Sequence, residues 1–116
     1  MATYNNREIH LLERPDGLPM ADDFGVVETT VAAAADDDIV VKNLYMSVDP
    51  AMRPALSNGA TPLNEVMAAS AIGHVVESND ATIPVGTCVR SRLGFREYAV
   101  AKAKDLEVIV LSLIHI

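Results

Sequence analysis

One short segment combines residue types that could bind a small polar ligand. An apolar run ends abruptly at Asp49-Pro50, and Ala51, Met52 and Arg53 follow directly. The guanidinium of Arg53 is a strong donor to carbonyl, carboxylate or phosphate oxygens, and Met52 offers a soft apolar wall. The alternative interpretation is structural: Asp49 caps a helical turn and Arg53 is a surface residue. Residue type and spacing leave both interpretations open.

The histidines and the cysteine carry weaker signals. His10 and His74 lie in apolar runs that predict strands, and neither has a cysteine or histidine nearby at ligand spacing. We therefore expect ordinary strand histidines rather than metal ligands. Cys88 follows a turn, which favours a small packed residue over a nucleophile. The acidic run at residues 36–38 lacks the alternating ligands and the glycine of a calcium loop, so we interpret it as a solvated loop.

Composition limits the classes of partner. The 116 residues suffice for one domain, and the formal net charge of −7 argues against nucleic-acid binding and against a polybasic membrane patch. No apolar run reaches the roughly 18 residues of a membrane span. The single cysteine rules out a disulfide framework within the chain and a Cys-rich zinc site, and it is typical of a cytoplasmic protein. Neither a P-loop nor a Gly-x-Gly-x-x-Gly fingerprint occurs, so the sequence offers no phosphate cradle.

The elements that must position the 49–53 corner are mostly strands. Short runs rich in Val, Ile, Leu and Tyr alternate with Gly, Pro, Asn and Asp clusters. They predict strands at 7–14, 24–31, 38–49, 71–77, 88–93 and 95–101, a last apolar run at 106–111, and a short helical turn at 51–56. Such spacing indicates a barrel or sandwich rather than a parallel α/β sheet.

Several blocks of sequence resemble one family. NLYMSVDPAMR at 43–53 closely resembles the motif NLYLSVDPYMR of zinc-independent medium-chain reductases, a group that includes prostaglandin, alkenal and bacterial curcumin reductases. LERPDGLP at 12–19 is similar to the opening of that family. PLNEVM at 62–67 with IGHVVES at 72–78, and GFREYAV at 94–100, resemble its later blocks. Order and spacing agree across residues 12–106.

This resemblance implies a mainly β fold, a GroES-like partly open β-barrel with short helical turns, over residues 1–110. It implies a second, Rossmann domain that binds most of the NADPH, and a homodimer in the full-length form. The activity implied is hydride transfer to the activated C=C of enones, enals or quinone-like substrates, for which this chain alone is incomplete. Residues 111–116 depart from the family, so we expect a truncated or frame-shifted tail; a native C-terminus is the competing interpretation.

The same resemblance assigns roles to the corner. Asp49 and Pro50 are expected to contact the cofactor, and Ala51, Met52 and Arg53 the substrate. Ala51 stands where the family has tyrosine, which implies a roomier pocket. No cysteine occurs at 47–49, where zinc-dependent relatives have a ligand, so no metal is expected. Catalytic residues are not assigned, and a stand-alone GroES-like interaction module is the alternative function.

Overall fold

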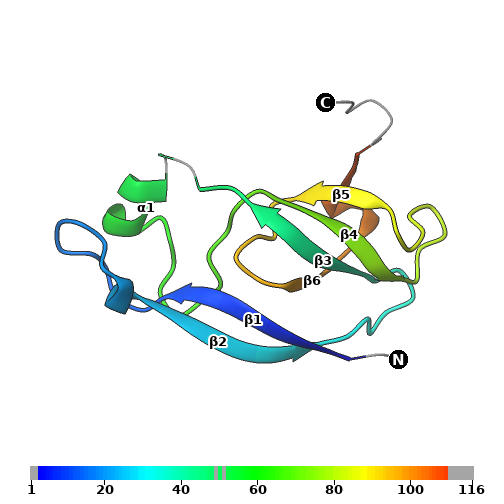
Figure 1. Ribbon diagram of the computed structural model, residues 1–116, viewed down its shortest axis with the longest axis horizontal. Helices are drawn as coiled ribbons and strands as arrows, with labels where there is room; N and C mark the ends of the chain where they lie inside the picture. Colours follow the sequence, from blue (N-terminus) through cyan, green and yellow to red (C-terminus); the bar gives the residue numbers. More distant parts are fainter. Residues whose placement is uncertain (1–2, 49, 51, 110–116) are drawn as a thin grey trace.

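The structure, a computed structural model, describes residues 3–48, 50 and 52–109. In chain order the elements are β1 (Tyr4–Leu11), η1 (Ala21–Asp23), β2 (Phe24–Val31), β3 (Ile39–Met46), α1 (Met52–Asn58), β4 (Ala71–Ser78), β5 (Cys88–Ser91), β6 (Tyr98–Ala101), η2 (Ala103–Asp105) and β7 (Glu107–Val108). Strands β1 and β2 form one sheet, and the order β6-β3-β4-β5-β7 forms the other (Figure 1). The mainly β architecture predicted from the sequence is confirmed.

The N-terminal hairpin joins the larger sheet along β1. On one edge β1 pairs with β2 in unbroken antiparallel register, from Tyr4 opposite Val31 to Leu11 opposite Phe24. On the other edge its backbone bonds to two segments that are not strands: Ile9 N donates to Phe95 O at 2.8 Å, and Met67 N donates to Ile9 O at 2.9 Å. These bonds bring the two sheets together, but within residues 3–48, 50 and 52–109 they do not close a continuous barrel.

Two apolar clusters form the core. The first is built mainly from inward residues of the larger sheet, because side chains two apart on a strand share a face. Its buried strand members are Ile39, Val41, Val75 and Val89, and Ile83 joins them from the loop between β4 and β5. The second lies between the hairpin and α1 and contains buried Leu11, Leu56 and Met67, with Ile9, Phe24 and Phe95 packed against it. Burial of this second cluster fixes the end of the molecule at which α1 sits (Figure 1).

Several predicted boundaries differ from the structure. The strand predicted at 24–31 is confirmed, but the one predicted at 7–14 is Tyr4–Leu11, because the chain turns before buried Pro15, which has no N–H to donate. The strands predicted at 88–93 and 95–101 shorten to Cys88–Ser91 and Tyr98–Ala101. The helical turn predicted at 51–56 is observed at Met52–Asn58. The 111–116 tail lies outside the described residues.

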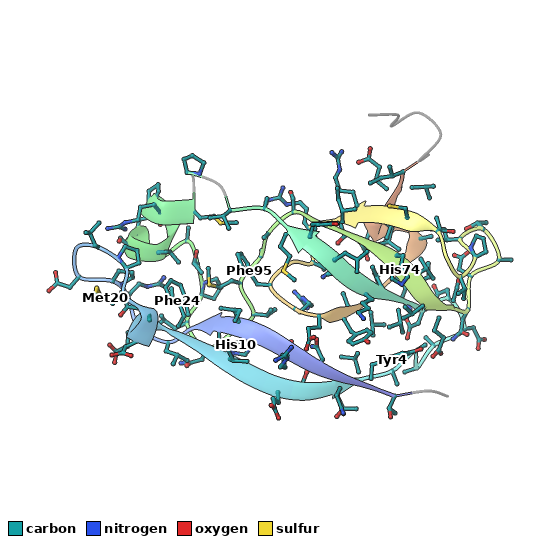
Figure 2. The ribbon with its side chains drawn as sticks, viewed as in Figure 1. Tyr4, His10, Met20, Phe24, His74 and Phe95 are labelled. Atoms are coloured by element: carbon teal, nitrogen blue, oxygen red, sulfur yellow. The ribbon has the colours of Figure 1, made fainter. Side chains whose placement is uncertain are left out.

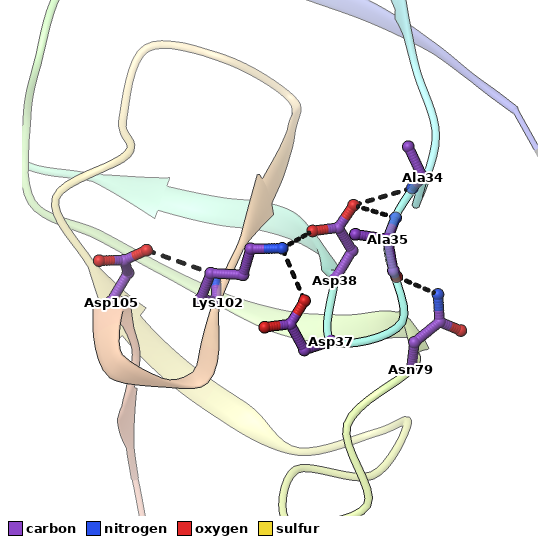
Figure 3. Close-up of polar contacts among 7 residues, drawn as sticks. All are labelled: Ala34, Ala35, Asp37, Asp38, Asn79, Lys102 and Asp105. Carbon is purple, nitrogen blue, oxygen red and sulfur yellow. Dashed lines mark hydrogen bonds and ion pairs between the residues drawn. The ribbon is translucent and has the colours of Figure 1, made fainter.

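The acidic run at 36–38 is more structured than the predicted solvated loop. Asp38 is buried, and its Oδ2 accepts hydrogen bonds from the backbone N–H groups of Ala34 and Ala35, both at 2.8 Å (Figure 3). Lys102 Nζ lies 2.5 Å from Asp38 Oδ1 and 2.8 Å from Asp37 Oδ1. These contacts fasten the β2–β3 loop to the end of β6.

Candidate functional site

An apolar pocket of about 360 Å³ lies beside α1. Its walls come from the hairpin, α1 and two loops, and the lining residues are Ile9, Phe24, Val48, Met52, Arg53, Leu56, Met67 and Phe95. In Figure 2, Phe24 lies at the start of β2 and Phe95 lies above β1. Because five of these residues are buried in the second core cluster or packed against it, the floor of the pocket is preformed.

Two larger concavities are polar. One of about 460 Å³ is lined by residues of β1 and β2 and by Glu97, whose Oε1 pairs with Arg7 Nε at 2.7 Å. Another of about 490 Å³ lies beside β5 and β7, where Arg90 pairs with Glu107. A pocket that removes an organic molecule from water needs apolar walls with a few polar groups. The pocket beside α1 fits this description better than either groove.

The structure places two of the five predicted site residues in this pocket. Met52 and Arg53, from the first turn of α1, both line it. Pro50 is exposed and is not among the lining residues, while Asp49 and Ala51 lie outside the described residues. The predicted roles of all five residues in ligand binding stay predictions.

Among the described residues, Arg53 is the only charged residue that lines the pocket. Its guanidinium also makes hydrogen bonds within the protein. Its Nη1 donates to Ser57 Oγ at 2.6 Å, and its Nη2 donates to the carbonyl of Gly17. A guanidinium carries five N–H donors, so these two bonds leave others for a ligand oxygen. Arg53 is therefore neither a freely solvated surface residue nor fully used by the fold.

Sequence reasoning missed the part played by Phe95. This residue has φ 53°, a left-handed conformation that is rare for a bulky residue. Asn43 stabilises the turn, since its Nδ2 donates to the carbonyls of Leu93 at 2.8 Å and Arg96 at 3.0 Å. Phe95 O also accepts from Ile9 N at 2.8 Å. The signal available was the GFREYAV block at 94–100, whose Gly94 leaves room for Ala69, because an added Cβ would lie 2.8 Å from the Ala69 carbonyl oxygen.

A polar cluster lies between the hairpin and this turn. Glu8 Oε1 lies 2.9 Å from His10 Nε2, and Glu8 Oε2 accepts from Asn6 Nδ2 at 3.0 Å. Burial lowers the pKa of Arg96, and the nearby Glu8 carboxylate partly opposes that shift. His10 is thus a strand histidine with a carboxylate partner. Among the described residues no three His, Cys, Asp or Glu side chains gather where they could hold a metal ion.

Comparison with known proteins identifies the class. The GroES-like fold of this chain is the fold of the amino-terminal domain of medium-chain reductases. The chain belongs to the family described as the N-terminal domain of oxidoreductase, which it matches over residues 7–109. No helix among the described residues is long and apolar enough to cross a membrane.

The individual proteins that this chain resembles are reductases of the same kind. NADPH-dependent curcumin reductase of Escherichia coli is 29% identical over 106 residues, which cover 87% of this chain and 31% of that protein. Prostaglandin reductase 1 of Sus scrofa is 29% identical over 93 residues, covering 78% of this chain and 27% of that protein. The crystal structure of CurA from Vibrio vulnificus has a TM-score of 0.81 and 31% identity, and the match covers 90% of this chain and 31% of that one. The chain therefore spans about a third of the length of these relatives.

Proposed function

We propose that this chain is the substrate-side domain of an NADPH-dependent reductase that reduces the activated C=C of enones, enals or quinone-like compounds. The observation that carries the proposal is the apolar pocket whose wall includes Met52 and Arg53 of the predicted corner. Its aliphatic and aromatic walls suit the hydrocarbon part of such a substrate, and its guanidinium suits the carbonyl oxygen.

The chemistry asked of this chain is positioning and charge stabilisation. NADPH would supply a hydride, which adds to the β-carbon of the unsaturated carbonyl and moves the π electrons toward the carbonyl oxygen. A hydrogen bond from Arg53 to that oxygen would stabilise the developing enolate, which would then take a solvent-derived proton at the α-carbon. Phe24, Met67 and Phe95 would exclude water and orient the C=C.

We infer that the corner contacts one end of NADPH. Val48, which lines the pocket, is 82% exposed, and Pro50 is also exposed. The sequence has no glycine-rich phosphate cradle, so these residues suit contact with the nicotinamide ring and not with the phosphates. We accordingly propose that Asp49 and Pro50 contact the ring and that a second domain binds the rest of the cofactor.

The end of β3 offers a surface for that second domain. Leu44, Tyr45 and Met46 are exposed and lead directly to Val48 at the pocket. Tyr45 is 73% exposed, which is unusual for a large aromatic residue and typical of a contact surface. By the same resemblance we propose a cytoplasmic, metal-independent, homodimeric full-length enzyme. A stand-alone interaction module would also need the exposed residues 44–46. Only a measurement of reductase activity therefore distinguishes the two functions.

The test is a fusion of this chain to the nucleotide-binding domain of the E. coli curcumin reductase. NADPH oxidation is then followed with aliphatic 2-alkenals, with curcumin and with the saturated aldehydes as controls. We expect turnover with the unsaturated compounds alone. A fusion that binds NADPH and yet reduces no α,β-unsaturated carbonyl or quinone would refute the reductase assignment, and an interaction module would then be favoured.

A further inference from the structure

Two arginines connect helix α1 and the loop at residues 12–20 in opposite directions. From the loop, Arg14 Nη1 donates to the carbonyl of Leu56 at 3.2 Å and to the carbonyl of Thr61. From the helix, Arg53 Nη2 donates to the carbonyl of Gly17. We call Arg14, Gly17, Arg53 and Leu56 with these bonds the arginine clasp. The loop and α1 accordingly lie side by side at one end of the molecule (Figure 1).

Helix α1 needs such external support. It has seven residues, and a helix of that length is unstable alone because nucleation costs more than so few hydrogen bonds return. The carbonyl of Leu56 belongs to its last turn and has no partner within the helix. A positively charged donor is favourable at this end, where the carbonyl dipoles point outward. Arg14 therefore satisfies the part of α1 that most needs a partner.

The loop depends on the clasp in return. Leu18 is 79% and Met20 is 66% exposed, so the distal part of the loop is not held by apolar packing. Gly17 has φ 82°, which glycine adopts without steric cost, and this conformation directs its carbonyl to Arg53. Buried Pro15 fixes the backbone direction immediately after Arg14. Beyond Pro15, hydrogen bonds rather than apolar packing hold the loop beside α1.

The clasp bears on the pocket because α1 supplies three of its lining residues, Met52, Arg53 and Leu56. We propose that Arg14 and Gly17 are positioning residues: they hold α1 so that the pocket is preformed for a small apolar carbonyl compound, with the Arg53 guanidinium fixed at its edge. Neither Arg14 nor Gly17 lines the pocket. The proposal rests on the proposed function, since it takes this pocket to be the ligand site. It gives the LERPDGLP block at 12–19 a role that the corner residues do not explain.

The test uses this chain, with 13C-labelled methionine methyl groups. Met52 and Met67 line the pocket, whereas Met20 lies in the loop, so their methyl signals report the two places separately. The probe is octan-2-one, a carbonyl compound without a reactive C=C. The variants are R14M and R14K, together with G17A and its matched control G59A. Gly17 and Gly59 both have positive φ, and an added Cβ would meet nothing within 4 Å at either, but only the Gly17 carbonyl accepts a bond from Arg53.

We expect saturable shifts of the Met52 and Met67 signals in the wild type. R14M removes a donor, and G17A disfavours the positive φ that directs the residue 17 carbonyl to Arg53. Each should weaken octan-2-one binding about five- to tenfold, the effect of losing a hydrogen bond from a charged donor. R14K should have an intermediate affinity for octan-2-one, because lysine keeps the charge but loses the planar, multi-donor guanidinium. G59A should bind like the wild type, although it carries a similar positive-φ strain.

The possible outcomes distinguish the proposed ligand pocket from the proposed role of the arginine clasp. No shift of Met52 or Met67 in the wild type would overturn the proposed ligand pocket itself. Normal wild-type binding with unchanged affinity in R14M and G17A would overturn the clasp alone. Equal loss of affinity in G17A and G59A would also overturn it, because the effect would then follow general destabilisation. If R14M does not fold, G17A and R14K give the same decision.

Discussion

The side-chain amide of Asn43 lies 2.8 Å from the carbonyl oxygen of Leu93, and this bond joins β3 to a turn fifty residues later in the chain. The same amide reaches the carbonyl of Arg96, so one buried side chain holds both sides of the turn that contains Phe95. The ring of Phe95 lines the pocket although its backbone has an unfavourable positive φ.

N43A should therefore destabilise the fold and alter the pocket together. Removing the Asn43 side chain leaves the carbonyls of Leu93 and Arg96 without their donor. We expect a loss of about 1–3 kcal/mol in the free energy of unfolding. Urea denaturation measures this loss, and octan-2-one binding measures the pocket. N79A is the matched control. The side-chain amide of Asn79 also donates a hydrogen bond to a backbone carbonyl, that of Ala35, but Asn79 is exposed. Equal stability of the two variants would contradict the role given to Asn43.

The Asp38–Lys102 contact should make stability depend on acid pH. The hydrogen bond from Lys102, followed by those from Ala34 and Ala35, lowers the pKa of Asp38 from 3.8 to about 2. A carboxyl group with a lowered pKa in the folded state stabilises the fold above its ordinary pKa and loses that contribution as the pH falls. D38N should thus be less stable than the wild type at neutral pH, with the difference shrinking between pH 3.8 and about 2.

Thermal unfolding of both proteins across this range measures the effect, and a difference that stays constant down to pH 2 would refute it. The alkaline pH range provides a control. The two aspartates, Asp37 first, raise the pKa of Lys102 to about 12, so its contribution is complete below its ordinary pKa of 10.5 and disappears toward pH 12. K102M should remove this alkaline transition, whereas K104M should preserve it, because Lys104 is exposed and makes no such contact within the described chain.

Gly73 should tolerate no side chain. An added Cβ would lie 2.1 Å from the carbonyl oxygen of Lys42 on the neighbouring strand, and a backbone atom cannot move aside as a side chain can. We expect G73A to cost at least about 2 kcal/mol, or to prevent folding of the β3–β4 pair. At Gly25 the nearest atoms belong to the side chain of Leu12, so G25A should be milder. Similar denaturation midpoints for the two variants would argue against this packing.

R53Q should impair the fused reductase. Glutamine keeps one N–H donor group but loses the charge, so the developing enolate is stabilised less, and we expect kcat/KM for 2-alkenals to fall about ten- to hundredfold. The affinity for NADPH should change little. R92Q is a suitable control because Arg92 is exposed and is not among the lining residues of this pocket. A normal kcat/KM in R53Q would remove Arg53 from the proposed mechanism.

The sequence by itself determined the class of fold, most of the strands and the corner that supplies part of the pocket. Alternating apolar residues, Gly and Pro punctuation and the β-branched run of β3 are local patterns. β2 was predicted to the residue, since it begins directly after Asp22-Asp23 and ends where the alanine run at 32–35 begins. The family resemblance followed from short blocks in a fixed order, and the family match over residues 7–109 confirms it.

Only the tertiary structure decided which distant residues meet. Periodicity reports which face of a strand is buried, but not which loop covers it, so the approach of Arg14 to Leu56 and of Asn43 to Leu93 could not be read from the sequence. The position of Phe95 had the same origin, since its φ is imposed by contacts outside its own segment. A pocket assembled from separate segments exists only once long-range packing has brought them together.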